Sequence, residues 1–351
     1  MPASTHAATD PGGLIFSDAW ITAPPGHDHR DGWNLRLSQL EAKAQPEQWD
    51  DPNEPTGTLP VLSSYVRYTY ARAKEEGKFV TGADDRGTEI GAFNTGLFTP
   101  RFEPILALFE ANRNPGQQPW VFKDWVTLSD WRLRPLHVDA LQPATYFNDP
   151  AELVYDPTRE LVANLDHILV DREERWPPEL PEDEVQRRIM LDGAIREVGK
   201  RVRMNWRLAV PQFYWPSGSR NGRIQLLLPL RLGADRPAHL ALVVDRREDV
   251  YVGYTILTLS MAYKNARLVT RPESDWLSVA PTALSDATET DDHAAAKWRR
   301  VTAGDRCPIC GEPTKCAISA DNHTAVCCRV SEGGVPRAIP AGATVWIHRL
   351  R

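Results

Sequence analysis

Cysteine is missing from the first 306 of the 351 residues, and all five cysteines fall between Cys307 and Cys328. A secreted disulfide protein would distribute its pairs through the core, so this clustering instead favours a metal site in a reducing compartment. The sequence also lacks any apolar run of the ~18–20 residues that a membrane span needs. Residues 1–30 contain no apolar stretch typical of a secretory signal. These absences predict a cytoplasmic protein without a membrane segment.

Short enzyme signatures are missing as well. The chain has no GxxxxGK[ST] phosphate loop, no GxGxxG dinucleotide fingerprint, no HExxH zinc motif and no GxSxG nucleophile elbow. A net charge of −6 and a pI of about 5.9 argue against a nucleic-acid coat built from the whole chain. The sequence therefore assigns no reaction, and it leaves open whether the protein is an enzyme.

The cysteine spacing predicts one metal site with four sulfur ligands. Cys307 and Cys310 form a CxxC turn, which places two thiolates on one side of a tetrahedron. Cys316 and Cys327 would close the other side from a short hairpin. Four sulfurs in tetrahedral geometry favour zinc, and a closed site of this kind is structural. We therefore predict a structural Zn²⁺ in a small zinc ribbon.

Two neighbouring side chains are substitutes for a ligand in that set. Cys328 adjoins Cys327, but consecutive side chains on a strand point to opposite faces, which makes Cys328 a spare neighbour. His323 lies in the expected turn of the hairpin. A cluster of free buried thiols and an iron–sulfur cluster are the alternatives to zinc.

Composition divides the chain into four parts. Residues 1–30 are expected to form a flexible tail with a short ordered piece at 14–21, and residues 31–278 a main domain. Residues 279–296 are acidic and rich in small residues, which is typical of a linker. Residues 297–351 contain nine Lys or Arg and four Asp or Glu, so the ribbon carries +5 and the remainder −11.

Hydrophobic periodicity predicts a mixed α+β main domain with a largely antiparallel sheet. Helices are expected over residues 33–44, 62–76, 104–112, 182–203 and 258–269, and short strands over 79–81, 89–94 and 120–122. The helix over 182–203 is the clearest, with Val185, Ile189, Ile195, Val198 and Val202 near the helical period. Residues 161–171 fit either a buried strand or the start of a helix. Four strands at 209–215, 223–230, 240–245 and 250–257 should form an antiparallel meander packed on the helix over 182–203.

Polar residues inside apolar runs mark candidate chemistry, because buried polar groups need partners. Asp166 and His167 lie within the apolar segment 161–170, and His167 with Asp166 is a candidate acid–base pair. The alternative is a hydrogen-bonded core histidine, with Asp166 capping a helix or pairing with Arg175. Adjacent residues on a strand point to opposite faces, which argues against a direct pair.

A second group of polar residues is a candidate phosphate site. Lys264 and Arg267 are three residues apart on an expected helix and could clamp a phosphate beside Asn265. Asn94 follows an apparent strand and could place backbone donors in a tight turn. The alternative is a solvated basic helix face and an ordinary turn. If these residues converge with His167, with Lys264 as a third catalytic group and Arg175 on the phosphate, the pocket favours a nucleotide or an RNA end.

Several segments of the main domain resemble an uncharacterised bacterial domain family that is often joined to RNA-binding modules of the cold-shock or LOTUS kind. The matching segments are residues 93–97, 164–169, 175–177, 209–212, 224–230, 254–268 and 276–277. Residues 307–311, 316, 327–334 and 346–351 resemble the zinc ribbons of phage and plasmid primase-like proteins. The resemblance implies an RNA-related setting and no reaction, and this chain has a ribbon where relatives often have an OB or LOTUS fold.

These observations lead to one preferred function and one alternative. The preferred function is association with nucleic acid, RNA rather than DNA, with a main domain that binds or processes a nucleotide or RNA end and a ribbon that contacts phosphate. The alternative is a non-catalytic protein-interaction module in which zinc braces a docking surface, so a protein partner stays open.

Overall fold

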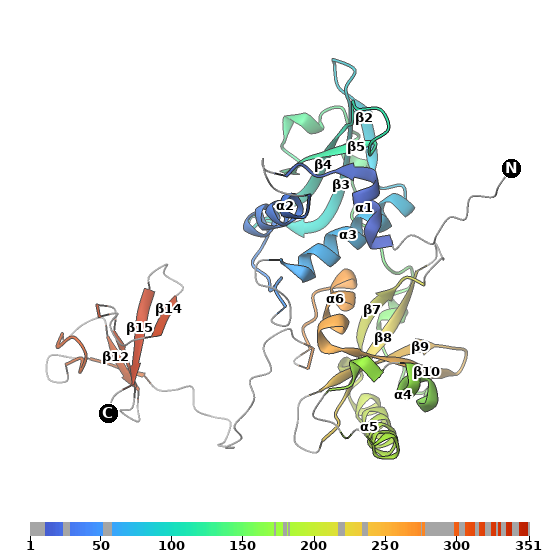
Figure 1. Cartoon of the computed structure of the whole chain (residues 1–351), viewed down its shortest axis with the longest axis vertical. Coiled ribbons are helices and arrows are strands. Elements are labelled where there is room, and N and C mark those ends of the chain that lie inside the picture. The colour runs from blue at the N-terminus through green and yellow to red at the C-terminus, as the bar shows by residue number, and fades with distance from the viewer. Residues whose placement is uncertain are drawn as a thin grey trace. The chain divides into compact units, whose positions relative to one another are not determined.

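The computed structural model describes residues 11–23, 29–51, 58–171, 173–177, 181, 183–216, 222–233, 238–274, 276–277, 298–301, 306–312, 316–319, 324–327, 329–330, 335–338 and 344–349. The chain divides into two compact units, Met1–Pro281 and Thr282–Arg351, and each is described by itself (Figure 1). The predicted linker 279–296 lies outside the described residues. None of the helices in the described ranges combines the length and hydropathy that a membrane crossing needs.

The first half of Met1–Pro281 is built on a five-stranded sheet, called sheet A, with strand order β1-β5-β4-β3-β2. Strand β1 pairs parallel with β5, and the other pairs are antiparallel. The core beneath sheet A is aromatic, since Tyr70 from a helix meets Phe93 and Phe109 from two strands. The elements are α1 (Leu14–Asp18), β1 (Ala19–Trp20), α2 (His29–Lys43), α3 (Pro60–Glu75), β2 (Val80–Ala83), β3 (Glu89–Phe98), β4 (Pro104–Ala111) and β5 (Trp120–Thr127).

The second half is built on sheet B, with strand order β6-β10-β9-β8-β7. Strand β6 runs parallel to β10, and the other neighbours are antiparallel. The elements are β6 (Glu160–Ala163), α4 (Leu165–Asp171), α5 (Glu184–Met204), β7 (Val210–Tyr214), β8 (Arg223–Leu230), β9 (Leu240–Arg246), β10 (Val250–Thr258) and α6 (Leu259–Val269). Short 3-10 turns are η1 (Pro11–Gly13), η2 (Trp131–Leu133), η3 (Val138–Ala140), η4 (Pro150–Leu153), η5 (Glu173–Arg175) and η6 (Trp206–Leu208).

Both faces of sheet B are covered by helices, because apolar residues alternate along its central strands. Leu226 and Val244 pack in the core that contains α5, whereas Leu227 and Val243 pack in the core that contains α6. Figure 1 shows α5 and α6 on opposite sides of the sheet. Thr258 caps α6 by accepting a hydrogen bond from the amide of Met261 at 3.3 Å.

Thr282–Arg351 contains a small antiparallel sheet with strand order β11-β12-β13-β15-β14. The strands are β11 (Trp298–Arg300), β12 (Ala317–Ser319), β13 (Thr324–Cys327), β14 (Val335–Ala338) and β15 (Thr344–Arg349). Its core is formed by Val301 and Ile318 with three buried cysteines. A core this small is typical of a domain that depends on a metal for its stability.

The predicted α+β class and the four-strand meander are confirmed. The predicted helix over 104–112 is wrong, because this segment is β4, hydrogen-bonded to β3 on one side and β5 on the other. Its central residues Ile105–Phe109 are all buried, so the strand lacks the alternation that distinguishes strand from helix. Residues 161–171 form the end of β6 followed by α4.

The start of the compact unit and the buried face of α5 differ from the sequence expectations. Residues 11–23, placed by composition in a tail, form η1, α1 and β1, and Ile15 is fully buried. This ordered piece matches the one expected at 14–21, so the compact unit includes it. In α5, Ile195, Val198 and Val202 are buried as predicted, but Val185 and Ile189 are 65% and 67% exposed. Val185 and Ile189 therefore do not pack in the core.

Two glycines form a matched pair for a stability test. A Cβ on Gly82 would lie 2.3 Å from the backbone oxygen of Pro135, whereas a Cβ on Gly193 in α5 would meet nothing within 4 Å. We expect Gly82→Ala to lower the free energy of unfolding by about 1–3 kcal/mol, because the backbone must move. Gly193→Ala should raise it by roughly 1 kcal/mol through helix propensity. Urea denaturation followed by tryptophan fluorescence measures both, and equal stabilities for Gly82→Ala and wild type would contradict the close approach.

Candidate functional site

Three of the predicted site residues meet in one cavity on the α6 face of sheet B. His167, Arg175 and Asn265 line a cavity of about 470 Å³, here called the sheet-face cavity. They come from α4 and η5, which follow β6, and from α6, which follows β10. The remaining polar lining is formed by Gln212, Tyr214, Arg223, Gln225, Asp245, Arg247, Tyr254 and Thr255. The cavity is therefore more polar than a typical core-facing surface of a sheet.

The floor of this cavity is a hydrogen-bonded row of buried polar side chains across three strands. Gln212 on β7, Gln225 on β8 and Asp245 on β9 are 2%, 6% and 3% exposed. Gln212 Nε2 donates to Gln225 Oε1 at 2.9 Å, and Gln225 Nε2 donates to Asp245 Oδ1 at 2.8 Å. Asn265 Nδ2 extends the row by donating to Gln212 Oε1 at 3.1 Å. Because the carboxylate at one end only accepts, every amide in the row is fixed in one orientation.

Guanidinium groups lie at the Asp245 end of this row. Arg223 donates to both carboxylate oxygens of Asp245, at 3.2 and 2.9 Å. This hydrogen bonding raises the pKa of Arg223. Arg247 lies 3.7 Å from the same carboxylate. Asp245 thus holds two cations at the cavity while its own charge is largely neutralised.

Each of these arginines also lies over a tyrosine ring. The guanidinium carbon of Arg223 is 5.2 Å from the centre of the Tyr214 ring. That of Arg247 is 5.9 Å from the centre of the Tyr254 ring. Cation–π contact of this kind holds a guanidinium flat on the ring while leaving its hydrogen-bond donors available.

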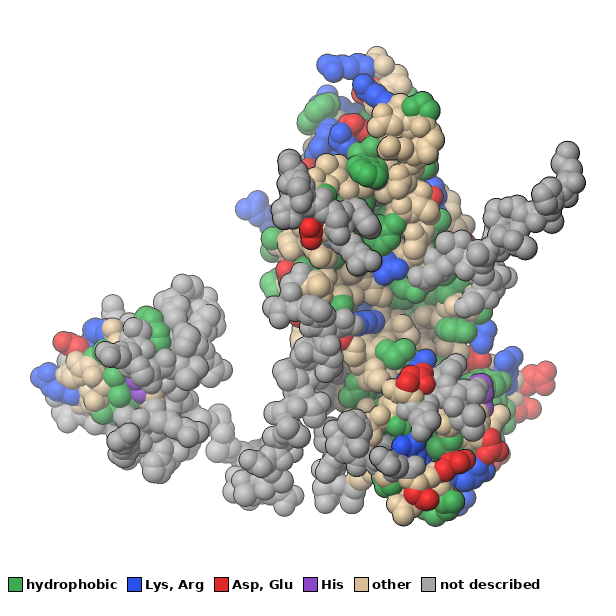
Figure 2. Space-filling view, viewed as in Figure 1, with side chains coloured by type: hydrophobic (Ala, Val, Ile, Leu, Met, Phe, Trp, Pro, Cys, Tyr) green, Lys and Arg blue, Asp and Glu red, His purple; other side chains and the backbone are tan. Residues whose placement is uncertain are grey.

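Arg175 is the third guanidinium of the cavity, and its position is fixed by β10. It donates to the backbone oxygen of Ile256 at 2.6 Å and to the hydroxyl of Thr255 at 3.3 Å. With Arg223 and Arg247, three guanidinium groups and one carboxylate line the cavity, a formal excess of two positive charges among the lining side chains. Arg175 also lies 3.5 Å from Glu174, which is outside the lining. Figure 2 shows both acidic and basic side chains on the visible face of Met1–Pro281. The arrangement favours an anionic ligand.

Asp166 and His167 do not form the predicted acid–base pair geometry. Both are on the short helix α4, where adjacent residues do not face each other. Asp166 is exposed and forms an ion pair with Arg188 of α5, rather than the alternative pairing with Arg175. His167 is exposed at the cavity, so it is not a core histidine.

The predicted phosphate clamp on α6 is occupied by acidic partners. Lys264 lies 3.2 Å from the buried carboxylate of Asp51. Arg267 is 8% exposed and is held by both carboxylate oxygens of Glu47, one of them at 2.9 Å from Nη2. Neither residue lines the sheet-face cavity, and of the three clamp residues the structure brings only Asn265 there.

Asn94 lies in the other half of the unit, on strand β3 of sheet A. Its side chain donates to the backbone oxygen of Leu141 at 3.0 Å and accepts from the amide of Gly96 at 2.9 Å. Gly96 has a φ of +75°, so the asparagine stabilises a turn conformation that favours glycine. Asn94 lines a separate cavity of about 370 Å³ and not the sheet-face cavity. Its contact with a ligand stays a prediction.

Of the charged residues in the cavity, sequence reasoning identified Arg175 but missed Arg223, Asp245 and Arg247. Gln225 and Asp245 were detectable, because each is a polar residue within an otherwise apolar strand, the same signal that singled out Asp166 and His167. Arg223 and Arg247 lie at strand ends, where basic residues are common, and carried no such signal.

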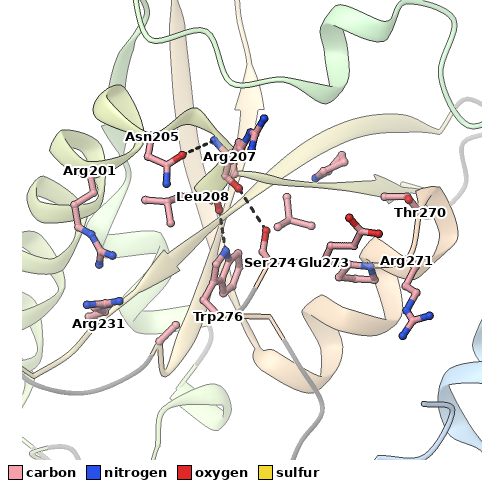
Figure 3. A pocket seen from close by; sticks show the side chains of 15 residues that line it. Arg201, Asn205, Arg207, Leu208, Arg231, Thr270, Arg271, Glu273, Ser274 and Trp276 are labelled. Carbon is pink, nitrogen blue, oxygen red and sulfur yellow. Dashed lines mark hydrogen bonds between the residues drawn. The ribbon is translucent and has the colours of Figure 1, made fainter. Parts of the chain in front are cut away.

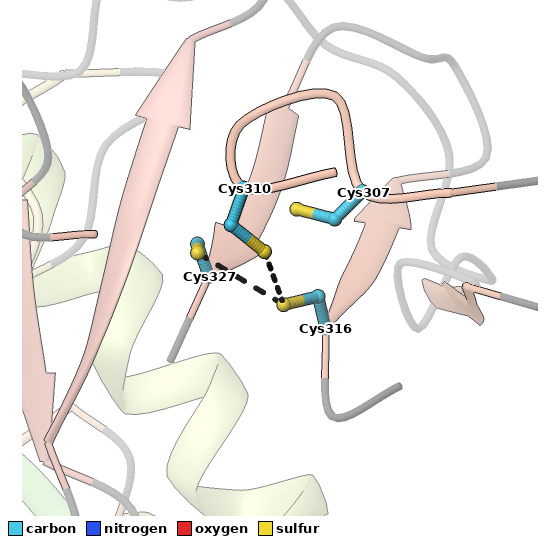
Figure 4. A group of neighbouring side chains, drawn as sticks. All are labelled: Cys307, Cys310, Cys316 and Cys327. Atoms are coloured by element: carbon cyan, nitrogen blue, oxygen red, sulfur yellow. Dashed lines mark hydrogen bonds between the residues drawn. The ribbon is translucent and has the colours of Figure 1, made fainter. Parts of the chain in front are cut away.

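The four predicted cysteines meet in Thr282–Arg351 (Figure 4). The sulfur atoms of Cys307, Cys310, Cys316 and Cys327 all lie within 4.8 Å of one another. The Sγ atoms of Cys310 and Cys316 are 3.7 Å apart, and those of Cys316 and Cys327 are 3.9 Å apart. Tetrahedral coordination with metal–sulfur bonds of about 2.3 Å requires sulfur separations of roughly 3.8 Å. The cluster therefore has the donor set and spacing of a metal site.

The backbone around the cluster positions the sulfur atoms and donates hydrogen bonds to them. Gly311, with a φ of +73°, closes the CxxC turn by donating to the backbone oxygen of Cys307 at 2.8 Å. Burial raises the pKa of the Cys310 thiol, but hydrogen bonds from the Glu312 backbone and from neighbouring thiols outweigh it and lower the pKa to about 7. The amide of Arg329 donates to Cys327 Sγ at 3.5 Å. These donors stabilise thiolates, the form that binds metal. Cys328 and His323 lie outside the described residues.

Comparison with known proteins identifies the main unit. No curated protein and no solved structure matches the chain. Residues 40–276 match the family described as Domain of unknown function (DUF3825). This range contains all of sheet B and the whole sheet-face cavity, and it ends before the cysteine cluster. The chain therefore belongs to the DUF3825 family, with a four-cysteine cluster added on its carboxyl side.

Proposed function

We propose that this protein associates with RNA and that its sheet-face cavity receives a phosphate-bearing nucleotide at an RNA end. The observation that carries the proposal is the excess of guanidinium over carboxylate groups around a fixed row of amides. Guanidinium forks match the geometry of phosphate oxygens and bind them in pairs. The resemblance of the domain to a family joined to RNA-binding modules supports RNA as the class of ligand.

Different parts of the cavity would take different parts of a nucleotide. Arg223 and Arg247 would bind phosphate, and the rings of Tyr214 and Tyr254 offer faces on which a base can stack. His167, whose side chain is exposed at the cavity, would be the acid or base in any processing of the bound end. Lys264 takes no part in this proposal, because it pairs with Asp51.

We further propose that the cysteine cluster holds one structural Zn²⁺ and that the ribbon contacts nucleic acid. The four sulfurs saturate a tetrahedral ion, which leaves no open position for catalysis. The excess of positive charge in residues 297–351 supports phosphate contact. The resemblance of this segment to the ribbons of primase-like proteins supports the same function.

Binding of a fluorescent single-stranded oligoribonucleotide to the full chain tests the cavity. We expect Arg247→Gln and Arg223→Gln each to weaken binding roughly tenfold or more, because a charge-assisted hydrogen bond contributes about 1.5–3 kcal/mol. Arg196→Gln is the matched control, since Arg196 is exposed on α5 and pairs with Asp192. A weaker complex with an oligonucleotide that lacks terminal phosphate would identify the end as the bound group. Equal affinities for wild type and both cavity variants would contradict the proposal.

Salt dependence separates the nucleic-acid function of the ribbon from the alternative, a protein-docking module. Each phosphate contact to a single strand contributes a slope of about −0.7 to the plot of log affinity against log salt concentration. We expect removal of zinc from the full chain to make this slope less steep, because contacts from the ribbon are lost. An unchanged slope after zinc removal would show that the ribbon makes no phosphate contact, and it would favour the protein-docking alternative.

A further inference from the structure

A second cavity of Met1–Pro281 is lined by four arginines and is distinct from the sheet-face cavity. It has a volume of about 990 Å³ and lies where the end of α5, η6, the start of β7 and the segment after α6 come together. Its guanidinium groups belong to Arg201, Arg207, Arg231 and Arg271, and it is called the arginine cavity here. Arg201 and Arg207 are close in the sequence, whereas Arg231 and Arg271 come from later segments that the fold brings beside them (Figure 3).

The charges in the arginine cavity are only partly balanced by the described residues of the protein. Glu273 is the one carboxylate among its lining residues, which leaves a formal excess of three positive charges. Arg201 Nη1 has a long contact of 3.5 Å with Glu197. Within the described part of the chain, Arg231 Nε is buried and has no hydrogen-bond partner. A buried guanidinium nitrogen without an acceptor costs free energy that an anionic ligand would recover.

The wall of the cavity is held in place before any ligand binds. Trp276 Nε1 donates to the backbone oxygen of Leu208 at 2.9 Å, and Ser274 Oγ donates to that of Arg207 at 3.4 Å. These bonds fasten the segment after α6 to η6. In the view of Figure 3, the guanidinium groups of Arg201 and Arg231 lie on one side of the Trp276 ring. A site fixed in this way loses little conformational entropy when it binds.

We propose that the arginine cavity binds a triphosphate group. A triphosphate carries three to four negative charges at neutral pH, which matches the excess of three positive charges far better than a single phosphate does. Four guanidinium groups supply enough forked donors for several phosphoryl groups at once. The group can belong to a free nucleoside triphosphate or to an RNA with a 5′-triphosphate. The proposal concerns residues that the RNA-end site does not use.

Calorimetric titration of the full chain with inorganic triphosphate tests the site directly. We expect saturable binding that weakens roughly tenfold or more in Arg231→Gln and in Arg201→Gln, since each loses charge-assisted hydrogen bonds. Arg271→Gln is a variant at an exposed position and should show a loss in the same direction without a risk to folding. Glu273→Gln should strengthen binding, because it removes the carboxylate that opposes the ligand. The control Arg196→Gln should bind like wild type.

Further titrations separate the two sources of the group and the two cavities. A nucleoside triphosphate that binds as tightly as a 5′-triphosphate oligoribonucleotide would identify the free nucleotide as sufficient, and a much tighter oligonucleotide would identify the RNA end. Arg231→Gln should lower the affinity for inorganic triphosphate more than Arg223→Gln does, and Arg223→Gln should lower the affinity for the oligoribonucleotide more than Arg231→Gln does, so failure of the RNA-end site and failure of this site give different results. The proposal is overturned if inorganic triphosphate does not saturate the chain, or if Arg196→Gln loses as much affinity as Arg231→Gln.

Discussion

One equivalent of zinc per chain is expected in the purified protein, and Cys316→Ser should lose it. Cys316 lies 3.7 and 3.9 Å from two other sulfurs of the cluster, so its removal opens the coordination sphere. Metal binding supplies roughly 10–16 kcal/mol to the folding of small zinc domains, far more than the few apolar residues of this core can replace. Elemental analysis measures the metal, and amide hydrogen exchange should show residues 298–349 unprotected in the variant.

The adjacent thiol is the matched control for this prediction. Cys328→Ser changes the same chemical group one residue from the ligand Cys327, and we expect the zinc content and the exchange protection to stay at wild-type levels. The main unit should keep its own thermal transition in both variants, because the cluster belongs to the other unit. Wild-type protein without zinc or iron would contradict the metal assignment. Loss of metal in Cys328→Ser would show that Cys328, and not Cys327, is the fourth ligand.

A single substitution of Glu47 or of Arg267 is expected to lower the free energy of unfolding of the main unit more than any other single change. Arg267 on α6 is bound by both oxygens of Glu47, and its guanidinium lies 4.9 and 4.4 Å from the ring centres of Trp49 and Tyr65. Burial lowers the pKa of Arg267, but hydrogen bonding and charge interactions with Glu47 and Tyr65 together outweigh burial and raise it. Glu47→Leu or Arg267→Met leaves one buried charge unpaired, which costs about 3–5 kcal/mol.

The double variant Glu47→Leu with Arg267→Met distinguishes this explanation from a simple loss of contacts. Replacement of a buried ion pair by apolar residues is often close to neutral, so the double variant should be more stable than either single variant. Urea denaturation followed by tryptophan fluorescence gives the three free energies of unfolding. Additive losses in the double variant would show that the cost comes from packing rather than from an unpaired charge.

The elements that the sequence predicted well are those with strong local signals. The meander of sheet B has alternating apolar residues with turns between strands, and α6 begins with a threonine cap. The segment 104–112 lacked such a signal. Its leucines and alanines favour a helix by propensity, but β3 and β5 provide hydrogen-bond partners on both edges, and pairing across the sheet overrides propensity.

The candidate site was predictable only where its chemistry is local in the sequence. The cysteine cluster spans 21 residues from Cys307 to Cys327, and its spacing predicted the four sulfurs that the structure brings together. Arg267, in contrast, has its acidic partner 220 residues away. No spacing rule connects residues at that distance. The sequence therefore predicted that Arg267 binds phosphate with Lys264, and only the fold identifies Glu47 as its partner.

Photo-cross-linking is the measurement that tests the central claim most directly. An oligoribonucleotide with 4-thiouridine next to its terminal phosphate would be bound to the full chain, irradiated, and the adducts located by mass spectrometry. The account predicts adducts on Tyr214 or Tyr254, the rings beside the cavity arginines, and their loss in Arg223→Gln but not in Arg196→Gln. Adducts that fall only outside the sheet-face cavity, unchanged in Arg223→Gln, would contradict it.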